Sequence, residues 1–118
     1  MGRLGMLLFA SPVQHRIVET AVDLAAAAAR QGHSVTMFLL ADGVYCSSRA
    51  LLSAPEESVL HRIAGLPASV ELVNCGTCAR FRGLEEEELL PHARNGTLED
   101  LVDLLSDCDR FLGLTGEG

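Results

Sequence analysis

The sequence is poor in aromatic residues. It contains no tryptophan, one tyrosine and four phenylalanines, whereas proteins that bind single-stranded nucleic acids stack the bases on such side chains. A core built from this chain must therefore consist mainly of alanine, leucine and valine. Nucleic-acid binding through stacked bases is not expected.

Positive charge is also scarce. The 118 residues include 9 Lys and Arg against 16 Asp and Glu, which gives a formal net charge of −7 and a sequence pI near 4.9. Phosphate backbones and anionic lipid surfaces repel such a chain. The composition therefore predicts no direct nucleic-acid partner and no membrane partner.

Long hydrophobic runs are missing as well. No stretch reaches the roughly 18 apolar residues of a membrane-spanning helix. The apolar start from Leu4 to Ala10 meets Ser11 and Pro12 without the basic flank and cleavage site of an export signal. We therefore expect a cytoplasmic protein, in which the four cysteines are reduced thiols rather than a disulfide scaffold.

The first 40 residues show a strand, a helix and a second strand. Leu4–Phe9 and Val35–Leu40 are continuous apolar runs, which are typical of strands covered on both faces. The residues between them have helical spacing, with Ser11 as candidate N-cap, Pro12 at the first helical position and Gly32 just beyond the end. Such a unit implies a parallel sheet with a right-handed crossover.

The rest of the chain continues this alternation. It predicts helices at Val44–Leu52, Pro55–Ala64 and Gly76–Arg82, a helix stop at Gly83, strands at Ser69–Asn74, Leu90–Arg94 and Arg110–Leu114, and a last helix capped by Thr97 and Asp100. With 48% hydrophobic and 21% charged residues, we expect one folded domain over residues 1–118. The predicted class is α/β, a three-layer α/β/α fold with a mainly parallel sheet of about five strands.

Three loops should lie at the carboxyl ends of the strands, where open parallel sheets bind their ligands. They begin at Ser11, Asp42 and Asn74. In the third loop, Cys75 stands where a strand meets a helix and lies within a helical turn or two of Arg80 and Arg82. The free amides of a helix start and a nearby guanidinium both favour a thiolate, so we expect a lowered pKa for Cys75.

The neighbours of Cys75 add to this chemistry. Gly76 lets the backbone approach a bound anion or a sulfur atom carried on the cysteine. Cys78 follows one helical turn later, within reach for a disulfide if the local geometry allows. Other rim residues are candidates for contacts with a bound anion, a persulfide or a partner: Ser11, His15, Tyr45, Thr77 and Arg82.

Several interpretations of the two cysteines remain open at this point. Cys75 and Cys78 could be small core residues, a thioredoxin-like dithiol, or part of an oligomeric module that binds a small anion without catalysis. A zinc site needs two further ligands, and the sequence offers only the isolated His61 and His92, so no metal is predicted.

A family resemblance becomes specific here. The segment Asn74–Gly83, with cysteine at its second position and Arg-Gly at its end, resembles the active-cysteine segment of the DsrE/TusD family of small sulfur-relay proteins. Asp42–Tyr45 is similar to that family's acidic-Gly-Val-Tyr turn. Cys108–Arg110 is similar to the segment that leads into its terminal strand. The order of these segments extends the resemblance over nearly the whole chain.

The resemblance implies a function. Cys75 would accept sulfane sulfur as a persulfide and pass it to a partner thiol, as a sulfurtransferase of the carrier kind, with donor and acceptor proteins and no cofactor. The family's folds are α/β/α, and its members form trimers or hexamers. Cys78 departs from the single-cysteine pattern and suggests reductive release of the sulfur. Cys46 could face Cys75, although a half-buried helix position is the simpler expectation, and Cys108 is expected in the core.

Overall fold

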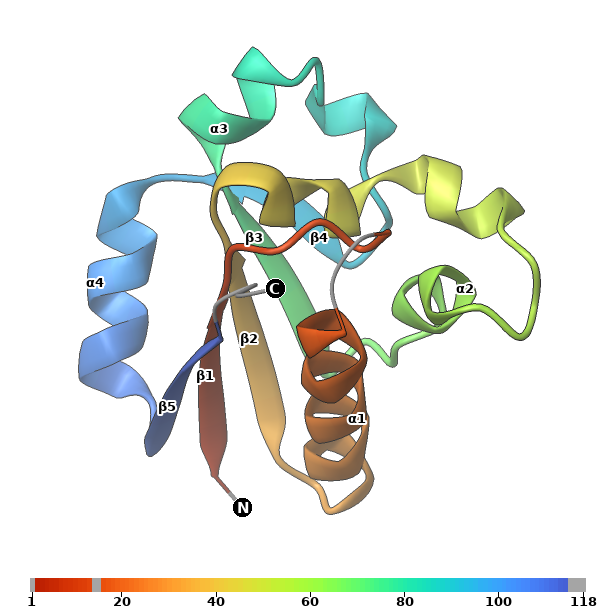
Figure 1. Cartoon of the computed structure of the whole chain (residues 1–118). Helices are drawn as coiled ribbons and strands as arrows, with labels where there is room; N and C mark the ends of the chain where they lie inside the picture. The colour runs from red at the N-terminus through yellow and green to blue at the C-terminus, as the bar shows by residue number, and fades with distance from the viewer. Residues whose placement is uncertain (1, 14–15, 115–118) are drawn as a thin grey trace.

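The structure, a computed structural model that describes residues 2–13 and 16–114, is organised around a five-stranded sheet. The strands are β1 (Arg3–Leu8), β2 (Ser34–Leu39), β3 (Val70–Cys75), β4 (Ala93–Gly96) and β5 (Arg110–Leu114). Every neighbouring pair is parallel, in the order β4-β3-β2-β1-β5. In Figure 1 the carboxyl ends of the strands point upwards. The predicted α/β class with a parallel sheet is confirmed.

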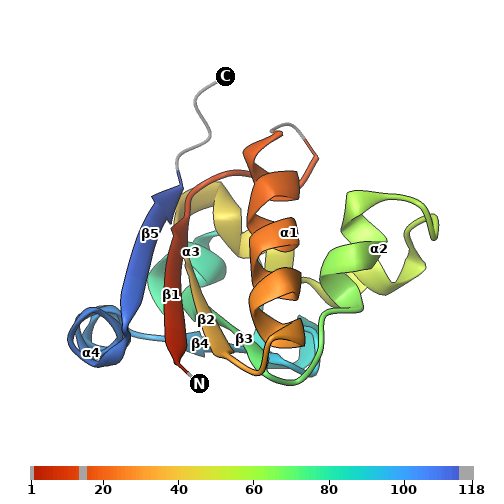
Figure 2. The ribbon, with the colours of Figure 1, turned by 90° about the horizontal axis from the view of Figure 1, so that it is seen from below.

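Helices cover both faces of the sheet. Helices α1 (Ile17–Arg30) and α2 (Val59–Ala64) lie on one side, and α4 (Leu98–Asp107) lies on the other (Figure 2). Above the carboxyl ends of the strands are α3 (Gly76–Phe81) and the 3-10 segment η1 (Ala41–Ser47) (Figure 1). Two further 3-10 segments are η2 (Arg49–Ser53) and η3 (Glu86–Glu88). The predicted three layers are therefore present.

The continuous apolar runs of the strands follow from this double coverage. On β3, Val70 and Leu72 face the buried cluster beneath α1 and α2, whereas Val73 and Cys75 belong to a second cluster that contains Leu104 of α4. Successive side chains of a strand point to opposite faces. Apolar residues are consequently found on both faces of the strand, because helices cover both faces of the sheet.

Several helix ends confirm the sequence prediction. Gly32 and Gly83 have φ values of 89° and 75°, a left-handed conformation that costs glycine little and that suits the residue just after a helix. At the start of α4, Thr97 and Asp100 form the predicted capping box, in which the Thr97 N–H donates to Asp100 Oδ2 at 2.8 Å.

The start of α1 differs from the prediction. The helix begins at Ile17 after Arg16, not at Pro12. The Ser11 hydroxyl instead accepts a hydrogen bond from the Val13 N–H at 3.3 Å. Serine side chains commonly satisfy a nearby backbone amide in this way, which stabilises a turn in place of a helix. Ser11 therefore caps a turn, and its assignment as the N-cap of the helix was wrong.

The two helices predicted after β2 are also shorter than expected. The span Val44–Leu52 is divided between η1 and η2, with an extended Ser48 between them. Ser48 accepts the Ala50 N–H at 3.1 Å and forms a bridge with Leu89, which interrupts the helix. In the predicted helix Pro55–Ala64, only the part from Val59 onward is helical, because Ser58 caps it through the His61 N–H.

The strands shift slightly relative to the apolar runs. β1, β2 and β3 each begin and end within one residue of the prediction, and β5 agrees with it. The fourth strand was placed at Leu90–Arg94, but Leu90 is buried in the core and the ladder with β3 starts at Ala93. Within the described residues, no helix is long and apolar enough to cross a lipid bilayer.

Candidate functional site at the carboxyl edge of the sheet

Cys75 occupies the point where the chain connections diverge. It is the last residue of β3 and the N-cap of α3. The connection after β3 packs through Ala79 and Leu84 into the cluster on the α1 side, whereas the connection after β4 leads to α4 and Leu104 on the opposite side. Ligands of open α/β sheets bind in the crevice at such a divergence. The predicted strand-to-helix position of Cys75 is confirmed.

The side chain of Cys75 is largely covered. It is 8% exposed and packs with Phe38, Val73 and Leu104. It makes no side-chain hydrogen bond to the start of α3. Cys75 therefore leaves only a small part of its surface through which a reagent can reach it.

Cys78 lies on the first turn of α3 and is half-buried. It packs against the cluster on the α1 side and against the cluster on the α4 side, so it lies at the end of the sheet between the two. Both Cys75 and Cys78 are free thiols. The structure thus presents two reduced cysteines one helical turn apart at the same edge.

Gly76 marks a close backbone approach, as the sequence analysis predicted, but the neighbour is the protein itself. A Cβ on Gly76 would lie 2.8 Å from the Gly96 carbonyl oxygen and 3.3 Å from Arg80 Nη1. Any side chain at this position would collide with the end of β4. The glycine therefore lets β4 and α3 meet, and it brings a guanidinium next to the backbone that follows Cys75.

Arg82 joins two of the predicted loops. Its Nε donates to Asp42 Oδ1 at 3.0 Å, and its Nη1 donates to the Cys78 carbonyl at 3.1 Å. The first contact fixes the loop after β2, and the second satisfies a carbonyl near the end of α3. Arg82 is thus bound within the rim by a carboxylate and a carbonyl.

Asn74 is a structural residue that sequence reasoning did not single out. Its side chain is fully buried, and its Nδ2 donates to Ser47 Oγ and to Asn95 Oδ1, both at 2.9 Å. Asn95 Nδ2 in turn donates to the Leu84 carbonyl at 3.2 Å. Asn74 therefore ties η1, β4 and the loop after α3 to the strand that carries Cys75. A polar residue directly after the apolar Leu72-Val73 pair was the available signal.

The remaining rim residues differ in their accessibility. Ser11 is buried, Tyr45 is 39% exposed in η1, and Thr77 is exposed at the start of α3. Thr77 Oγ1 lies 3.5 Å from Arg80 Nη2. His15 lies outside the described residues. Tyr45 and Thr77 can therefore meet a ligand or partner directly, while Ser11 acts through the turn that it caps.

Of the other two cysteines, Cys46 is buried in the core and Cys108 is half-buried at its border. Cys46 is 1% exposed in the cluster on the α1 side, and its sulfur lies 3.9 Å from the Ala10 carbonyl oxygen. Burial raises the pKa of the Cys46 thiol to about 12. A half-buried residue that could face Cys75 was expected at this position. This expectation was wrong, because the two cysteines pack on opposite faces of the sheet. Cys108, for which a core position was predicted, packs against the α4 cluster but is only half-buried.

The described residues contain no group of three or more His, Cys, Asp or Glu side chains arranged to hold a metal ion. His61 and His92 each have a buried ring nitrogen without a hydrogen-bond partner in the described part of the chain. They lie in α2 and just before β4, respectively.

Comparisons with known proteins agree with this architecture. The model of the DsrE/DsrF-like family matches residues 3–114. An uncharacterised protein of Methanocaldococcus jannaschii is 32% identical over 98 residues, which cover 79% of this chain and 82% of that protein. An uncharacterised protein of Methanopyrus kandleri is 28% identical over 94 residues, with coverages of 79% and 78%.

Two solved structures share the fold. The crystal structure of the ychN protein from E. coli superposes with a TM-score of 0.80 at 22% identity and covers 96% of this chain and 99% of its own. A protein of unknown function from Methanobacterium thermoautotrophicum superposes with a TM-score of 0.67 at 12% identity, with coverages of 95% and 99%.

Proposed function

We propose, from the premise that the chain belongs to the DsrE/DsrF-like family, that it transfers sulfane sulfur as a persulfide on Cys75. The observation that carries the proposal is the place of this cysteine, at the end of β3 and the start of α3 on the carboxyl edge of a parallel sheet. A free thiol at this edge stands where such folds receive their ligands.

The transfer is a pair of thiol exchange steps. The Cys75 thiolate attacks the outer sulfur of a donor persulfide, so that a sulfur–sulfur bond forms on Cys75 and the donor's sulfur–sulfur bond breaks. The donor leaves as a thiolate. An acceptor thiolate then attacks the outer sulfur on Cys75 and restores its thiolate. The two steps together move one neutral sulfur atom and need no external oxidant or reductant.

The turn that follows Cys75 carries groups that can bind an anion. Arg80 brings a guanidinium close to the backbone of Gly76, directly after Cys75, and Thr77 presents an exposed hydroxyl on the same turn. A guanidinium and a hydroxyl on this turn would pair with an anionic group of a sulfur donor or acceptor that approaches Cys75. Arg82, which the sequence analysis favoured, contributes by holding the loop of Asp42 against α3.

Cys78 offers a second outcome for a loaded Cys75. Its thiolate could attack the inner sulfur of the persulfide, release sulfide and leave a Cys75–Cys78 disulfide, which a dithiol reductant must then reduce. Wild-type protein loaded with sulfur should then release sulfide faster than Cys78→Ser. Equal rates in the two proteins would remove Cys78 from the mechanism.

The proposal includes partners and a location. Sulfur must come from one protein thiol and go to another, and self-association into a homotrimer or hexamer belongs to the same hypothesis. Phe81 on α3 and Leu98 on α4 are exposed by 84% and 60%, which leaves apolar surface for such contacts. A reducing cytoplasmic location suits the four free thiols.

Intact-mass spectrometry after incubation with a persulfide donor tests the function. The wild type and Cys108→Ser should gain the mass of one sulfur atom, and Cys75→Ser should gain none. Cys108→Ser is the control because it also removes one free thiol, from a cysteine that packs against the same cluster as Cys75. A loss of two hydrogens without added sulfur would favour a dithiol oxidoreductase. No change, together with tolerance of Cys75→Ser, would favour a binding module.

A further inference from the structure

The two edges of the sheet differ in how they are protected. β4 and β5 are the outermost strands, and among the described residues β4 pairs only with β3 and β5 only with β1. An edge strand presents a row of backbone N–H and C=O groups to which a further strand can add. Because proteins usually block such edges, an edge without protection is a candidate contact surface.

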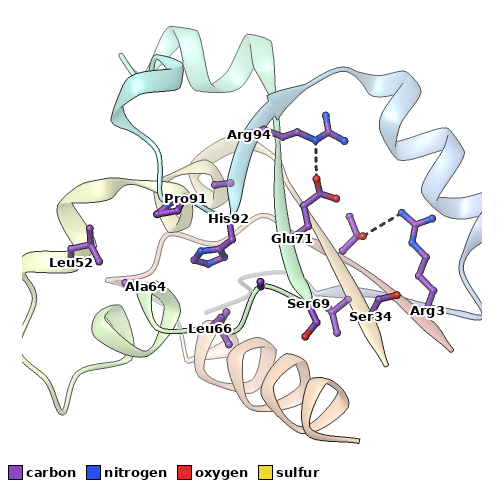
Figure 3. A pocket seen from close by; sticks show the side chains of 14 residues that line it. Arg3, Ser34, Leu52, Ala64, Leu66, Ser69, Glu71, Pro91, His92 and Arg94 are labelled. Carbon is purple, nitrogen blue, oxygen red and sulfur yellow. Dashed lines mark hydrogen bonds and ion pairs between the residues drawn. The ribbon is translucent and has the colours of Figure 1, made fainter. Parts of the chain in front are cut away.

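The chain itself blocks the β4 edge. The Asn95 N–H donates to Glu86 Oε2 at 2.6 Å, so this backbone group is already bonded to the segment η3. Arg94 of β4 is paired with Glu71 of β3 at 2.9 Å, and Pro91 lies just before the strand (Figure 3). Proline and charged side chains are common devices against edge pairing. We therefore do not expect a further strand at β4.

The β5 edge has different features. The strand Arg110–Leu114 contains no proline and no acidic residue, and its central Leu112 is 38% exposed. A Cβ on Gly113 would meet no atom of the described residues within 4 Å, so no neighbour in the same chain requires a glycine there. A glycine inside a strand often marks the place where another backbone comes close. The open edge and the glycine both point to a strand from another chain.

An apolar groove runs beside β5 on the α1 side of the sheet. It has a volume of about 430 Å³ and is lined by Leu4 of β1, Leu24 and Ala28 of α1, and Leu112 of β5. Pairing of two strands alone is marginally stable in water. Burial of the apolar side chains in this groove would add to the stability of a strand pair at β5.

The distribution of charge allows two copies of this chain to meet at β5. Each copy carries −7, so two copies repel each other unless they meet where carboxylates are few. The only charged residue of β5 is Arg110. On α4, the carboxylates of Asp100, Asp103 and Asp107 line a cavity over β2 and β3 instead of the β5 edge.

We propose that β5 pairs with β5 of a second copy of this chain, in antiparallel orientation about a twofold axis beside Leu112. Leu112 is the middle residue of the strand, so the pairing places Phe111 opposite Gly113 of the other copy. The bulky side chain of the strand thus meets the position that has open space around it. The two Leu112 side chains meet next to the apolar grooves. The strand is its own complement, which a twofold contact between identical chains requires.

This contact joins the two sheets into one continuous sheet. A twofold contact gives an even number of copies, so it fits a dimer or a hexamer and excludes a lone trimer. The choice of the hexamer rests on the self-association in the proposed function, whereas the strand pairing itself does not.

Sedimentation equilibrium of the wild type and three variants tests the proposal. The wild type should contain an even number of copies. Leu112→Glu and Gly113→Glu should each halve its mass, because the new carboxylates of the two copies repel each other near the axis. Both residues are exposed, so circular dichroism should show the wild-type fold. Leu52→Glu is the control with unchanged mass, since Leu52 is 51% exposed in η2. A monomeric or odd-numbered wild type, or unchanged mass in both β5 variants, overturns the proposal.

Oxidative cross-linking tests the orientation. Residues that face each other in an antiparallel pair have Cα atoms about 4.5–5.5 Å apart, which is within the range of a disulfide. In the Cys75→Ser background, Leu112→Cys should form a dimer linked through residue 112 of both copies, and Leu52→Cys should not. The absence of this link by peptide mass spectrometry overturns the antiparallel pairing. Cys75→Ser itself should assemble as the wild type does, so the outcome is independent of the proposed sulfur transfer.

Discussion

Replacing Asn74 by alanine should measurably loosen the rim that carries Cys75. The change removes two buried hydrogen bonds, to Ser47 and Asn95, and leaves Asn95 Oδ1 without its donor. A typical net contribution is about 1 kcal/mol per hydrogen bond, and an acceptor left unpaired costs about as much again. Asn74 Oδ1 already lacks a partner among the described residues, and its removal offsets part of this loss. The expected destabilisation is on the order of 2 kcal/mol.

Urea unfolding of the wild type and three variants measures this effect. Asn95→Ala removes the bond from Asn74 and also the bond from Asn95 Nδ2 to the Leu84 carbonyl, so it should cost about as much as Asn74→Ala. Thr77 is exposed, so the free energy of unfolding of Thr77→Ala should stay within about 0.5 kcal/mol of that of the wild type. Amide hydrogen exchange should accelerate selectively in Ala41–Ser47, the segment that the Ser47 contact holds. A loss for Asn74→Ala as small as that of Thr77→Ala would refute the reasoning.

Three further predictions concern single residues. The pKa of Cys46 is raised from 9.0 to about 12 in the folded protein, so unfolding between these pH values releases its proton. The free energy of unfolding should therefore fall by about 1.4 kcal/mol per pH unit above pH 9. Cys46→Ala should flatten this slope, and parallel pH profiles of the variant and the wild type would contradict the assignment. The pKa of Asp100 is lowered, mainly by the hydrogen bond from the Thr97 backbone, so its stabilisation is present above the unfolded pKa and is lost as pH falls through the folded pKa. Asp100→Asn should therefore cost about 1 kcal/mol at pH 7 and little in strong acid, as chemical unfolding at the two pH values can test. Gly76→Ala would place a Cβ 2.8 Å from the Gly96 carbonyl oxygen, so it should lower the melting temperature clearly. A melting temperature equal to that of the wild type would show that α3 and the end of β4 can separate without loss of stability.

The sequence predicted the strands well where burial decides them. The apolar runs at β1, β2 and β3 are explained by a sheet that is covered on both faces. β4 was misplaced because its segment, Ala93–Gly96, has no apolar run and is defined by its ladder with β3. Apolar spacing also could not distinguish a continuous helix from the two 3-10 segments that meet at Ser48.

In the candidate site, too, some features follow from residues that are neighbours in the sequence and others from contacts between residues far apart in it. The position of Cys75 between a strand and a helix follows from its neighbours in the sequence, and the structure agrees. The contact between Arg82 and Asp42 joins residues 40 positions apart, and the fork of Asn74 joins three elements. Such contacts depend on the strand order, which local patterns do not reveal.

The accessibility of individual thiols tests the central claim, that Cys75 carries a reachable and reactive sulfur at the end of β3. Native protein is treated with a small alkylating reagent at neutral pH, and each cysteine is quantified by peptide mass spectrometry over time. Cys75 should be labelled well before Cys46, whose pKa of about 12 keeps it protonated. If Cys75 stays unlabelled for as long as Cys46 does, its sulfur is out of reach, and the proposed persulfide transfer is contradicted.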